Sequence, residues 1–283
     1  MHSLDQPFVF FDDARGRAVG RYYHKLHDEF YLREPQHIYD MAQVLRKALQ
    51  SGFHVAGYLS YEAGLLLEER TAPLLDHILE NGFDEPLGWF GIFDGYDAIE
   101  DGSKLLSGGA ASASITPQIS YAEYCAAFDA VQNYIRNGDI YQANLTFRCD
   151  GEFSGDILAL YAKLRGNAAA GYGGIINMQD HAILSFSPEL FFTLKDGSIA
   201  ARPMKGTAKV LPDSAANAAA KEALSVDPKQ RAENLMIVDL LRNDLSKICK
   251  TASVDVPALF HVESYPTVPV SYTHLTLPTI GSV

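Results

Sequence analysis

The sequence predicts an α+β fold. Short aromatic or β-branched runs bounded by Asp and Gly predict strands, and segments whose apolar residues recur at helical spacing lie between them. The two kinds of segment do not alternate with the regular spacing of βαβ units, which disfavours a doubly wound sheet. With 283 residues, of which 47% are hydrophobic, the chain is long enough to bury a sizeable core.

The first third of the chain mixes strands with a helix. Residues 38–49 (IYDMAQVLRKAL) have a helical apolar face, and residues 105–116 are mostly small and polar, as in a linker or exposed loop. We therefore expect an N-terminal region at residues 1–117 and a second region at residues 118–268. Strands in the first region are predicted at Phe8–Phe11, Val55–Tyr61 and Leu87–Phe93.

Capping residues predict two helices after this boundary. Ser120 and Glu123 form a capping box before an apolar stripe, and Gly138 ends that helix. The second helix begins after Asp227, with Pro228 at its first position and Gln230 completing a capping box, and should run to about Leu245.

Between these helices the residue pattern predicts strands. Residues 140–148 (IYQANLTFR) alternate apolar and polar side chains, so we expect one apolar and one polar face. Residues 182–194 predict two strands interrupted at Pro188, which has no N–H to donate. Ser198–Arg202 predicts a further short strand that ends at Pro203.

Residues 269–283 (PVSYTHLTLPTIGSV) change abruptly in character and carry no acidic or basic residue other than one His. Reverse translation of residues 269–279 resembles an adapter used in sequencing libraries. We therefore expect a non-native tail after Val268. An ordinary C-terminal loop is the alternative.

Charge and cysteine content exclude several classes of protein. The chain has 23 Lys and Arg against 35 Asp and Glu, a net charge of −12, and no basic cluster, so nucleic-acid binding is not expected. Its three cysteines form no Cys-x-x-Cys pair, which predicts neither a disulfide framework nor a zinc site. No basic n-region or long apolar run appears, so we expect no membrane association and a cytoplasmic protein.

Two segments carry side chains suited to catalysis. Residues 202–207 (RPMKGT) combine Lys205 with Gly206 and Thr207 in a predicted turn that could hold an anion, although a solvated surface lysine is the alternative. Glu189 follows an apolar run, where burial would suit it to donate a proton. The alternative for Glu189 is a rim glutamate at a strand bend.

The second helix offers a possible metal ligand. Glu233 lies near its start, where one carboxylate suits a Mg²⁺ site that substrate oxygens and waters complete. The alternative is a first-turn acid that interacts with the helix dipole. Further along the helix, we expect Arg242 to form a structural ion pair with Asp239 or Asp244.

Four motifs in this order resemble those of the chorismate-utilising enzymes, which include the anthranilate, aminodeoxychorismate, isochorismate and salicylate synthases. They are YIRNGDIYQANLTFR, SFSPELFF, ARPMKGTAK and DPKQRAENLMIVDLLRNDL. The resemblance runs from about Ser120 to Val268. It implies an anthranilate synthase component I-like sandwich of two antiparallel sheets with outer helices. The sandwich would be incomplete at the C-terminus, because the chain stops before the family's Gly-Ala-Pro-Lys segment, its carboxylate-binding Arg and its terminal acidic residues.

The resemblance also implies roles for individual residues. Gln142 stands where water-adding members carry a Lys as general base, and a Gln there indicates addition of ammonia. Lys205 matches the Lys with which aminodeoxychorismate synthases attack C2 of chorismate. Glu189 matches the acid that protonates the leaving C4 hydroxyl, and Gly206 and Thr207 match a turn that holds a substrate carboxylate.

The implied activity is amination of chorismate at C4 to 4-amino-4-deoxychorismate, on the route to 4-aminobenzoate and folate. Glu233 matches a ligand of Mg²⁺, the implied cofactor. Ammonia would come from a partner glutamine amidotransferase, because no Gly-x-Cys-x-Gly motif occurs in the sequence. Anthranilate synthase component I is the alternative, and we expect the chain as given, lacking part of the family's active site, to be inactive.

Overall fold

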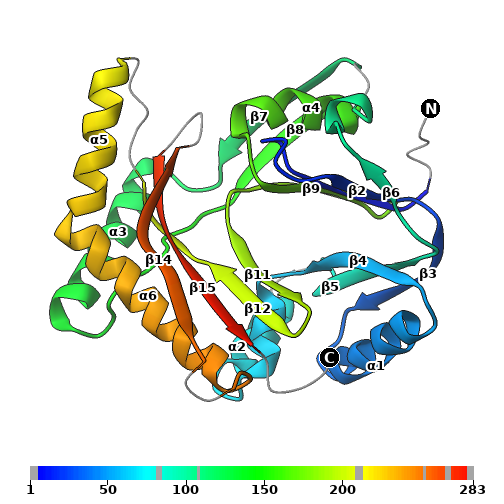
Figure 1. Cartoon of the computed structure of the whole chain (residues 1–283), viewed down its shortest axis with the longest axis horizontal. Coiled ribbons are helices and arrows are strands. Elements are labelled where there is room, and N and C mark those ends of the chain that lie inside the picture. Colours follow the sequence, from blue (N-terminus) through cyan, green and yellow to red (C-terminus); the bar gives the residue numbers. More distant parts are fainter. Residues whose placement is uncertain are drawn as a thin grey trace. The chain divides into compact units, whose positions relative to one another are not determined.

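The computed structural model describes residues 6–80, 85–106, 109–207, 213–250, 253–264 and 269–278 (Figure 1). Within these ranges, the side chains of residues 205–207, 214, 221, 258–264, 269–274 and 277 lie outside the description. The chain divides into a larger unit, residues 1–105 with 164–283, and a smaller unit, residues 106–163. The division predicted from the sequence, with boundaries at residues 117 and 268, stays a prediction. In the part of the chain described, no helix is long and apolar enough to span a membrane.

Two antiparallel sheets of the larger unit share a core. A five-stranded sheet has the order β10-β9-β1-β2-β6, and a three-stranded sheet has the order β3-β5-β4. Their strands are β1 (Phe8–Asp12), β2 (Gly20–Tyr23), β3 (Leu26–Leu32), β4 (His54–Leu59), β5 (Gly88–Phe93), β6 (Asp97–Ile99), β9 (Tyr172–Asn177) and β10 (Ala182–Ser187). The predicted N-terminal strands are therefore confirmed, with ends shifted by one or two residues.

Aromatic and aliphatic side chains from both sheets fill this core. Trp89 and Phe93 of β5 are fully buried and cluster with Val9 of β1 and Ile176 of β9. Strand β1 is buried on both faces, since Val9 and Phe10 are both 0% exposed. A continuous apolar run such as FVFF suits a central strand of this kind better than an alternating pattern would.

Helices cover the three-stranded sheet. Helix α1 (His37–Gln50) contacts β3 and β4 and confirms the predicted helix. Helix α2 (Ala72–Glu80) and the 3₁₀ helix η1 (Glu62–Leu67) complete a second apolar cluster. Its buried members are Leu32, Ala63, Leu75 and Leu87.

The C-terminal half of the larger unit is another antiparallel sheet with a helix on it. Its strands are β11 (Leu190–Lys195), β12 (Ser198–Arg202), β13 (Met204–Thr207), β14 (Asp255–Ser264) and β15 (Pro269–Pro278). Strand β15 pairs with β12 and β13 along one edge and with β14 along the other. Helix α6 (Pro228–Ser246), preceded by α5 (Ser214–Val226), packs Val238 and Leu245 against Ile199 and Leu275 of this sheet.

The last described residues take part in this sheet. Residues 269–278 form β15, in which Leu275 is 0% exposed. The alternative of a C-terminal loop is therefore wrong for these residues. The expectation of a non-native tail at residues 269–283 stays a prediction, and residues 279–283 lie outside the described part.

The smaller unit confirms one predicted helix. Helix α3 (Tyr121–Asn137) begins with the predicted capping box: Ser120 Oγ accepts the N–H of Glu123 at 3.3 Å, and Glu123 Oε2 accepts the N–H of Ser120 at 2.7 Å. These hydrogen bonds from Ser120 hold the pKa of Glu123 below its usual value. Gly138 ends the helix in the left-handed region at φ 81°. No residue of α3 is buried, so the apolar stripe is only partly covered.

Two predictions in the smaller unit are wrong. Residues 140–148 form no strand, because the ladder of β7 (Ala111–Pro117) with β8 (Cys149–Gly155) begins only at Cys149. Alternation of side chains gives a segment two faces but no ladder partner, and Tyr141 of the expected apolar face is 89% exposed. The expected loop at residues 105–116 is also partly wrong, since residues 111–116 lie in β7. Small polar residues can pair through their backbone without burying side chains.

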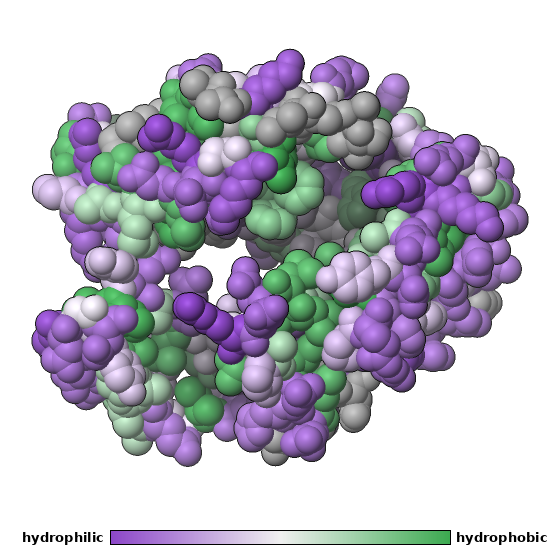
Figure 2. Space-filling view, turned by 90° about the horizontal axis from the view of Figure 1, so that it is seen from below, coloured by the Kyte–Doolittle hydropathy of each residue, from purple (hydrophilic) through white to green (hydrophobic). Residues whose placement is uncertain are grey.

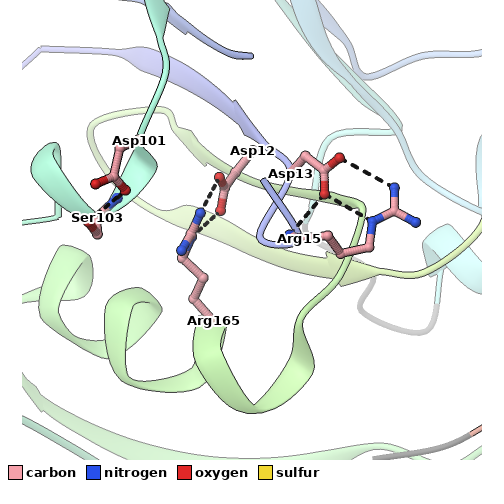
Figure 3. A network of polar contacts seen from close by, with 6 residues as sticks. All are labelled: Asp12, Asp13, Arg15, Asp101, Ser103 and Arg165. Atoms are coloured by element: carbon pink, nitrogen blue, oxygen red, sulfur yellow. Dashed lines mark hydrogen bonds and ion pairs between the residues drawn. The ribbon is translucent and has the colours of Figure 1, made fainter. Parts of the chain in front are cut away.

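Two buried carboxylates at the end of β1 are each held by an arginine (Figure 3). Asp12, 6% exposed, binds Arg165 in a bidentate pair: Nε lies 2.6 Å from Oδ2, and Nη2 lies 3.0 Å from Oδ1. Asp13 Oδ1 accepts the backbone N–H and Nε–H of Arg15, each at 3.0 Å. Arg165 lies in the last turn of α4 (Ile157–Ala168), so the first pair fixes the end of that helix to β1.

Replacing Arg165 by Met would deprive the buried Asp12 carboxylate of both hydrogen bonds from the guanidinium. We expect the free energy of unfolding to fall by about 3 kcal/mol, as for other broken buried pairs. Urea unfolding followed by the fluorescence of Trp89, the single tryptophan, measures this. The matched control is Arg242→Met, which removes an exposed guanidinium 3.9 Å from Asp239 and should cost less than about 0.5 kcal/mol. Equal losses in the two variants would contradict the expectation.

The phenol of Tyr58 should lose its proton at a higher pH than an ordinary tyrosine. Burial first, and then the charge of Glu85, raises the pKa of Tyr58 from 10.0 to about 12. The neutral phenol therefore contributes stability that is complete below about pH 10 and is lost as the pH rises towards 12. Spectrophotometric titration of phenolate absorbance should show a late step that is missing in Tyr58→Phe. An unchanged late step in this variant would assign it to another tyrosine.

Candidate active site

The hairpin of β11 and β12 brings Glu189 close to the segment that precedes Lys205. Asp196 (φ 52°) and Gly197 (φ 71°) form its two-residue turn, and at the other end Leu190 pairs with Arg202. At that open end, Glu189 Oε1 accepts a 3.0 Å hydrogen bond from the backbone N–H of Met204. The predicted proton donor is therefore fixed beside the strand of the predicted nucleophile.

Residues 187–189 fix the bend that carries Glu189. The strand is interrupted at Pro188 as predicted, with β10 ending at Ser187 and β11 beginning at Leu190. Ser187 Oγ accepts the N–H of Glu189 at 3.2 Å and donates to the Glu189 carbonyl oxygen at 3.1 Å. Glu189 is exposed and lies at the bend, so the expectation of a buried acid is wrong, while its role as a proton donor stays a prediction.

Lys205, Gly206 and Thr207 lie in strand β13, and not in the predicted turn. Met204 pairs with Tyr272 and Thr207 with Val270, so the register shifts by one residue between them. An irregularity of this kind re-aims side chains, and Gly tolerates it well. The side chains of Lys205, Gly206 and Thr207 lie outside the described part of the structure, and their predicted roles stay predictions.

Helix α6 carries Glu233 over the same sheet, since it contacts β13 and β15. The helix starts as predicted, with Pro228 in its first turn and Asp227 Oδ1 accepting the N–H of Gln230 at 2.7 Å, and it ends one residue later than expected. The reciprocal half of the predicted capping box is absent, because Gln230 Oε1 is buried without a hydrogen-bond partner.

Glu233 lies in the second turn of α6. The first turn contains no acidic residue, so the alternative of a first-turn acid is wrong. The Glu233 side chain is 33% exposed, and its Oε1 lies 3.8 Å from Lys229 Nζ. Within the described ranges, no three His, Cys, Asp or Glu side chains come together as a metal site. Glu233 thus offers one carboxylate and not a complete ligand set.

A cavity of about 780 Å³ runs along the later turns of α6 and faces the residues around the start of β14. Apolar side chains form part of its wall and polar ones the rest. The cavity is lined by Leu235, Val238, Asp239, Arg242, Asn243, Ser246, Val254 and Val256. The predicted ion pair of Arg242 with Asp239 is confirmed there, although at 3.9 Å it is loose and exposed. Glu189 and Glu233 do not line this cavity.

Strand β11 exposes large apolar side chains next to Glu189. Phe191 is 78% and Phe192 51% exposed. Among the described strands, β11 pairs with β12 alone, so its other edge has no partner there. Figure 2 shows hydrophobic residues at the surface of the face it presents.

Gln142 belongs to the smaller unit. It is partly exposed and lies in the segment 140–148, which has no regular structure. Its position relative to Glu189 and Lys205 is not described, so the proposed role of Gln142 stays a prediction.

Ser187 and the Met204 amide were not identified from the sequence as part of the candidate site. The available signal was the position of Ser187 two residues before Glu189, a spacing that favours a turn closed by the serine hydroxyl.

Comparisons with known sequences identify relatives of this chain. A family model described as chorismate binding enzyme matches residues 9–276. Aminodeoxychorismate synthase component 1 of Klebsiella aerogenes is 41% identical over 150 residues, which cover 53% of this chain and 33% of that protein. Anthranilate synthase component 1 of Arthrobacter globiformis is 33% identical over 159 residues, 54% of this chain and 30% of that protein. The matched segments thus span about a third of these curated relatives.

Solved structures show the same fold. An isochorismate synthase of Bacillus anthracis matches 99% of this chain and 70% of its own, with a TM-score of 0.74 and 17% identity. Anthranilate synthase component I of Streptococcus pneumoniae matches 82% of this chain and 58% of its own, with a TM-score of 0.64 and 22% identity. The expected α+β fold of this enzyme class is thereby confirmed.

The cap of α6 should matter for stability. Replacing Asp227 by Ala removes the acceptor of the 2.7 Å bond to Gln230, and we expect a loss of about 1 kcal/mol in the free energy of unfolding. Asp213→Ala is the matched control, because Asp213 caps α5 through a longer, exposed bond of 3.3 Å to Ala215. Urea unfolding followed by far-UV circular dichroism compares them. A larger loss for Asp213→Ala would contradict this ranking.

Proposed function

The chain belongs to the chorismate binding enzyme family, and from this we propose that it is part of an aminodeoxychorismate synthase component I. The proposed reaction converts chorismate and ammonia into 4-amino-4-deoxychorismate and water, on the route to 4-aminobenzoate and folate. The observation that carries the proposal is the hydrogen bond from the Met204 N–H to Glu189 Oε1. It holds a carboxyl group at the residue that precedes Lys205 in the sequence. A cytoplasmic location stays a prediction.

In the first proposed step, the neutral Lys205 amine forms a bond to C2 of chorismate. The two ring double bonds shift, and the C4–O bond breaks. Glu189 gives its proton to the departing oxygen, so the C4 hydroxyl leaves as water. This step needs an acid close to the nucleophile, and the hydrogen bond from the Met204 N–H holds Glu189 at the residue that precedes Lys205 in the chain.

In the second step, ammonia forms a bond to C4, and the double bonds shift back. The C2–N bond then breaks and releases Lys205, while the proton lost from the incoming nitrogen returns to the Glu189 carboxylate. Gln142 cannot remove a proton from water, which favours ammonia as the nucleophile. Gly206 and Thr207 would bind a carboxylate of the substrate.

We also propose Glu233 as a ligand of Mg²⁺. One carboxylate fits this ion when substrate oxygens and waters fill most of its positions, as is usual for Mg²⁺. Bound Mg²⁺ would supply positive charge for a dianionic substrate in a protein of net charge −12. We propose a partner glutamine amidotransferase as the source of the ammonia.

We further propose that the 283-residue chain is inactive by itself. The matched segments span about a third of the curated relatives, and β11 leaves an apolar edge uncovered among the described strands. The test compares this chain with the product of the complete reading frame at its source locus, each given chorismate, ammonium and Mg²⁺. Mass spectrometry should find 4-amino-4-deoxychorismate only with the product of the complete reading frame. Anthranilate as the product would refute the proposed branch, and turnover by the 283-residue chain would refute its inactivity.

Variants of the active protein test the proposed roles. Lys205→Ala should abolish a covalent adduct whose mass is that of chorismate less one water, because the bond to C2 cannot form. Glu189→Gln should lower kcat by roughly 10²- to 10⁴-fold, the usual range for loss of a general acid. The control is Lys195→Ala, which removes an exposed lysine of β11 and should leave both the covalent adduct and kcat unchanged. Full amination by Lys205→Ala would show that the covalent role is wrong.

A further inference from the structure

We propose that Ser187 is a positioning residue, which holds the Glu189 carboxylate on the Met204 amide. The inference deepens the proposed function, because it rests on Glu189 as the proton donor. It concerns how an exposed acid is kept in one place next to the strand that carries Lys205.

The Ser187 hydroxyl holds the peptide groups of Glu189 on both sides. Ser187 Oγ accepts a hydrogen bond from the Glu189 N–H at 3.2 Å and donates one to the Glu189 carbonyl oxygen at 3.1 Å. Between the two residues, Pro188 restricts the backbone further through its fixed φ. The direction in which the Glu189 side chain leaves the backbone is therefore set locally.

The Glu189 side chain then reaches a main-chain group fifteen positions away in the sequence. Pro203, which has no N–H, separates β12 from β13. The next amide belongs to Met204, and Glu189 Oε1 accepts its proton at 3.0 Å. The Glu189 carboxylate thus forms its hydrogen bond beyond the end of the β11–β12 ladder. This bond connects the bend at residues 187–189 to the start of β13.

This arrangement contributes little to folding but much to orientation. Glu189 is exposed, and a single exposed hydrogen bond adds little net stability. A general acid, however, must lie within hydrogen-bond reach of the oxygen that it protonates. Once Glu189 has given up its proton, the Met204 N–H also donates to the anion that remains. Loss of the hydroxyl should therefore reduce kcat and leave KM nearly unchanged.

The test compares Ser187→Ala with Ser187→Thr, which keeps the hydroxyl, and with Ser185→Ala, an exposed serine of β10, as the control. Hydrogen exchange of the Met204 amide in the 283-residue chain should be about fivefold faster in Ser187→Ala, because one hydrogen bond is weakened. In the active protein, kcat should fall about tenfold in Ser187→Ala and recover in Ser187→Thr.

The two measurements separate the possible failures. Unchanged Met204 exchange in Ser187→Ala would overturn the positioning role. Faster exchange with an unchanged kcat would overturn its importance for catalysis. If the unsubstituted protein consumes no chorismate, the proposed function fails, and the exchange measurement alone decides whether Ser187 fixes Glu189.

Discussion

The register of the β11–β12 hairpin is the constraint on which the candidate active site depends. The Asp196–Gly197 turn sets this register, because both residues adopt positive φ and the flanking Lys195 and Ser198 pair directly. Continued without interruption, the pairing would place Leu190 opposite Pro203, which has no N–H. An irregularity between Leu190 and Thr193 moves Leu190 opposite Arg202 instead. With Leu190 opposite Arg202, residue 189 comes level with Pro203, and the Glu189 side chain reaches the N–H of Met204 one residue further along.

The candidate site also lies where the chain passes from one sheet to another. Strand β10 is an edge of the sheet that contains β1, and β11 is an edge of the sheet that contains β15. Each sheet has its own apolar cluster, one around Trp89 and one around Val238. Pro188 interrupts the strand between them, so Pro188 and Glu189 lie outside both ladders, and Glu189 is available to carry a functional side chain.

The sequence predicted features that depend on neighbouring residues. The caps at Ser120 and Asp227 and the break at Pro188 rest on contacts within three residues, and the structure confirms these positions. Features that need a distant partner were missed. Residues 140–148 have the right alternation for a strand but no ladder partner in their unit. The contact with Met204 depends on the hairpin register, and no local pattern contains it.

The exposed edge of β11 relates the fold to the proposed inactivity. Natural edge strands are usually short, charged or covered, because a free row of backbone groups invites pairing with other chains. Here Phe191 and Phe192 are exposed, and only Lys195 and the register shift interrupt the edge. Glu189 directly precedes this strand, so any segment that paired with β11 would also border the proposed proton donor.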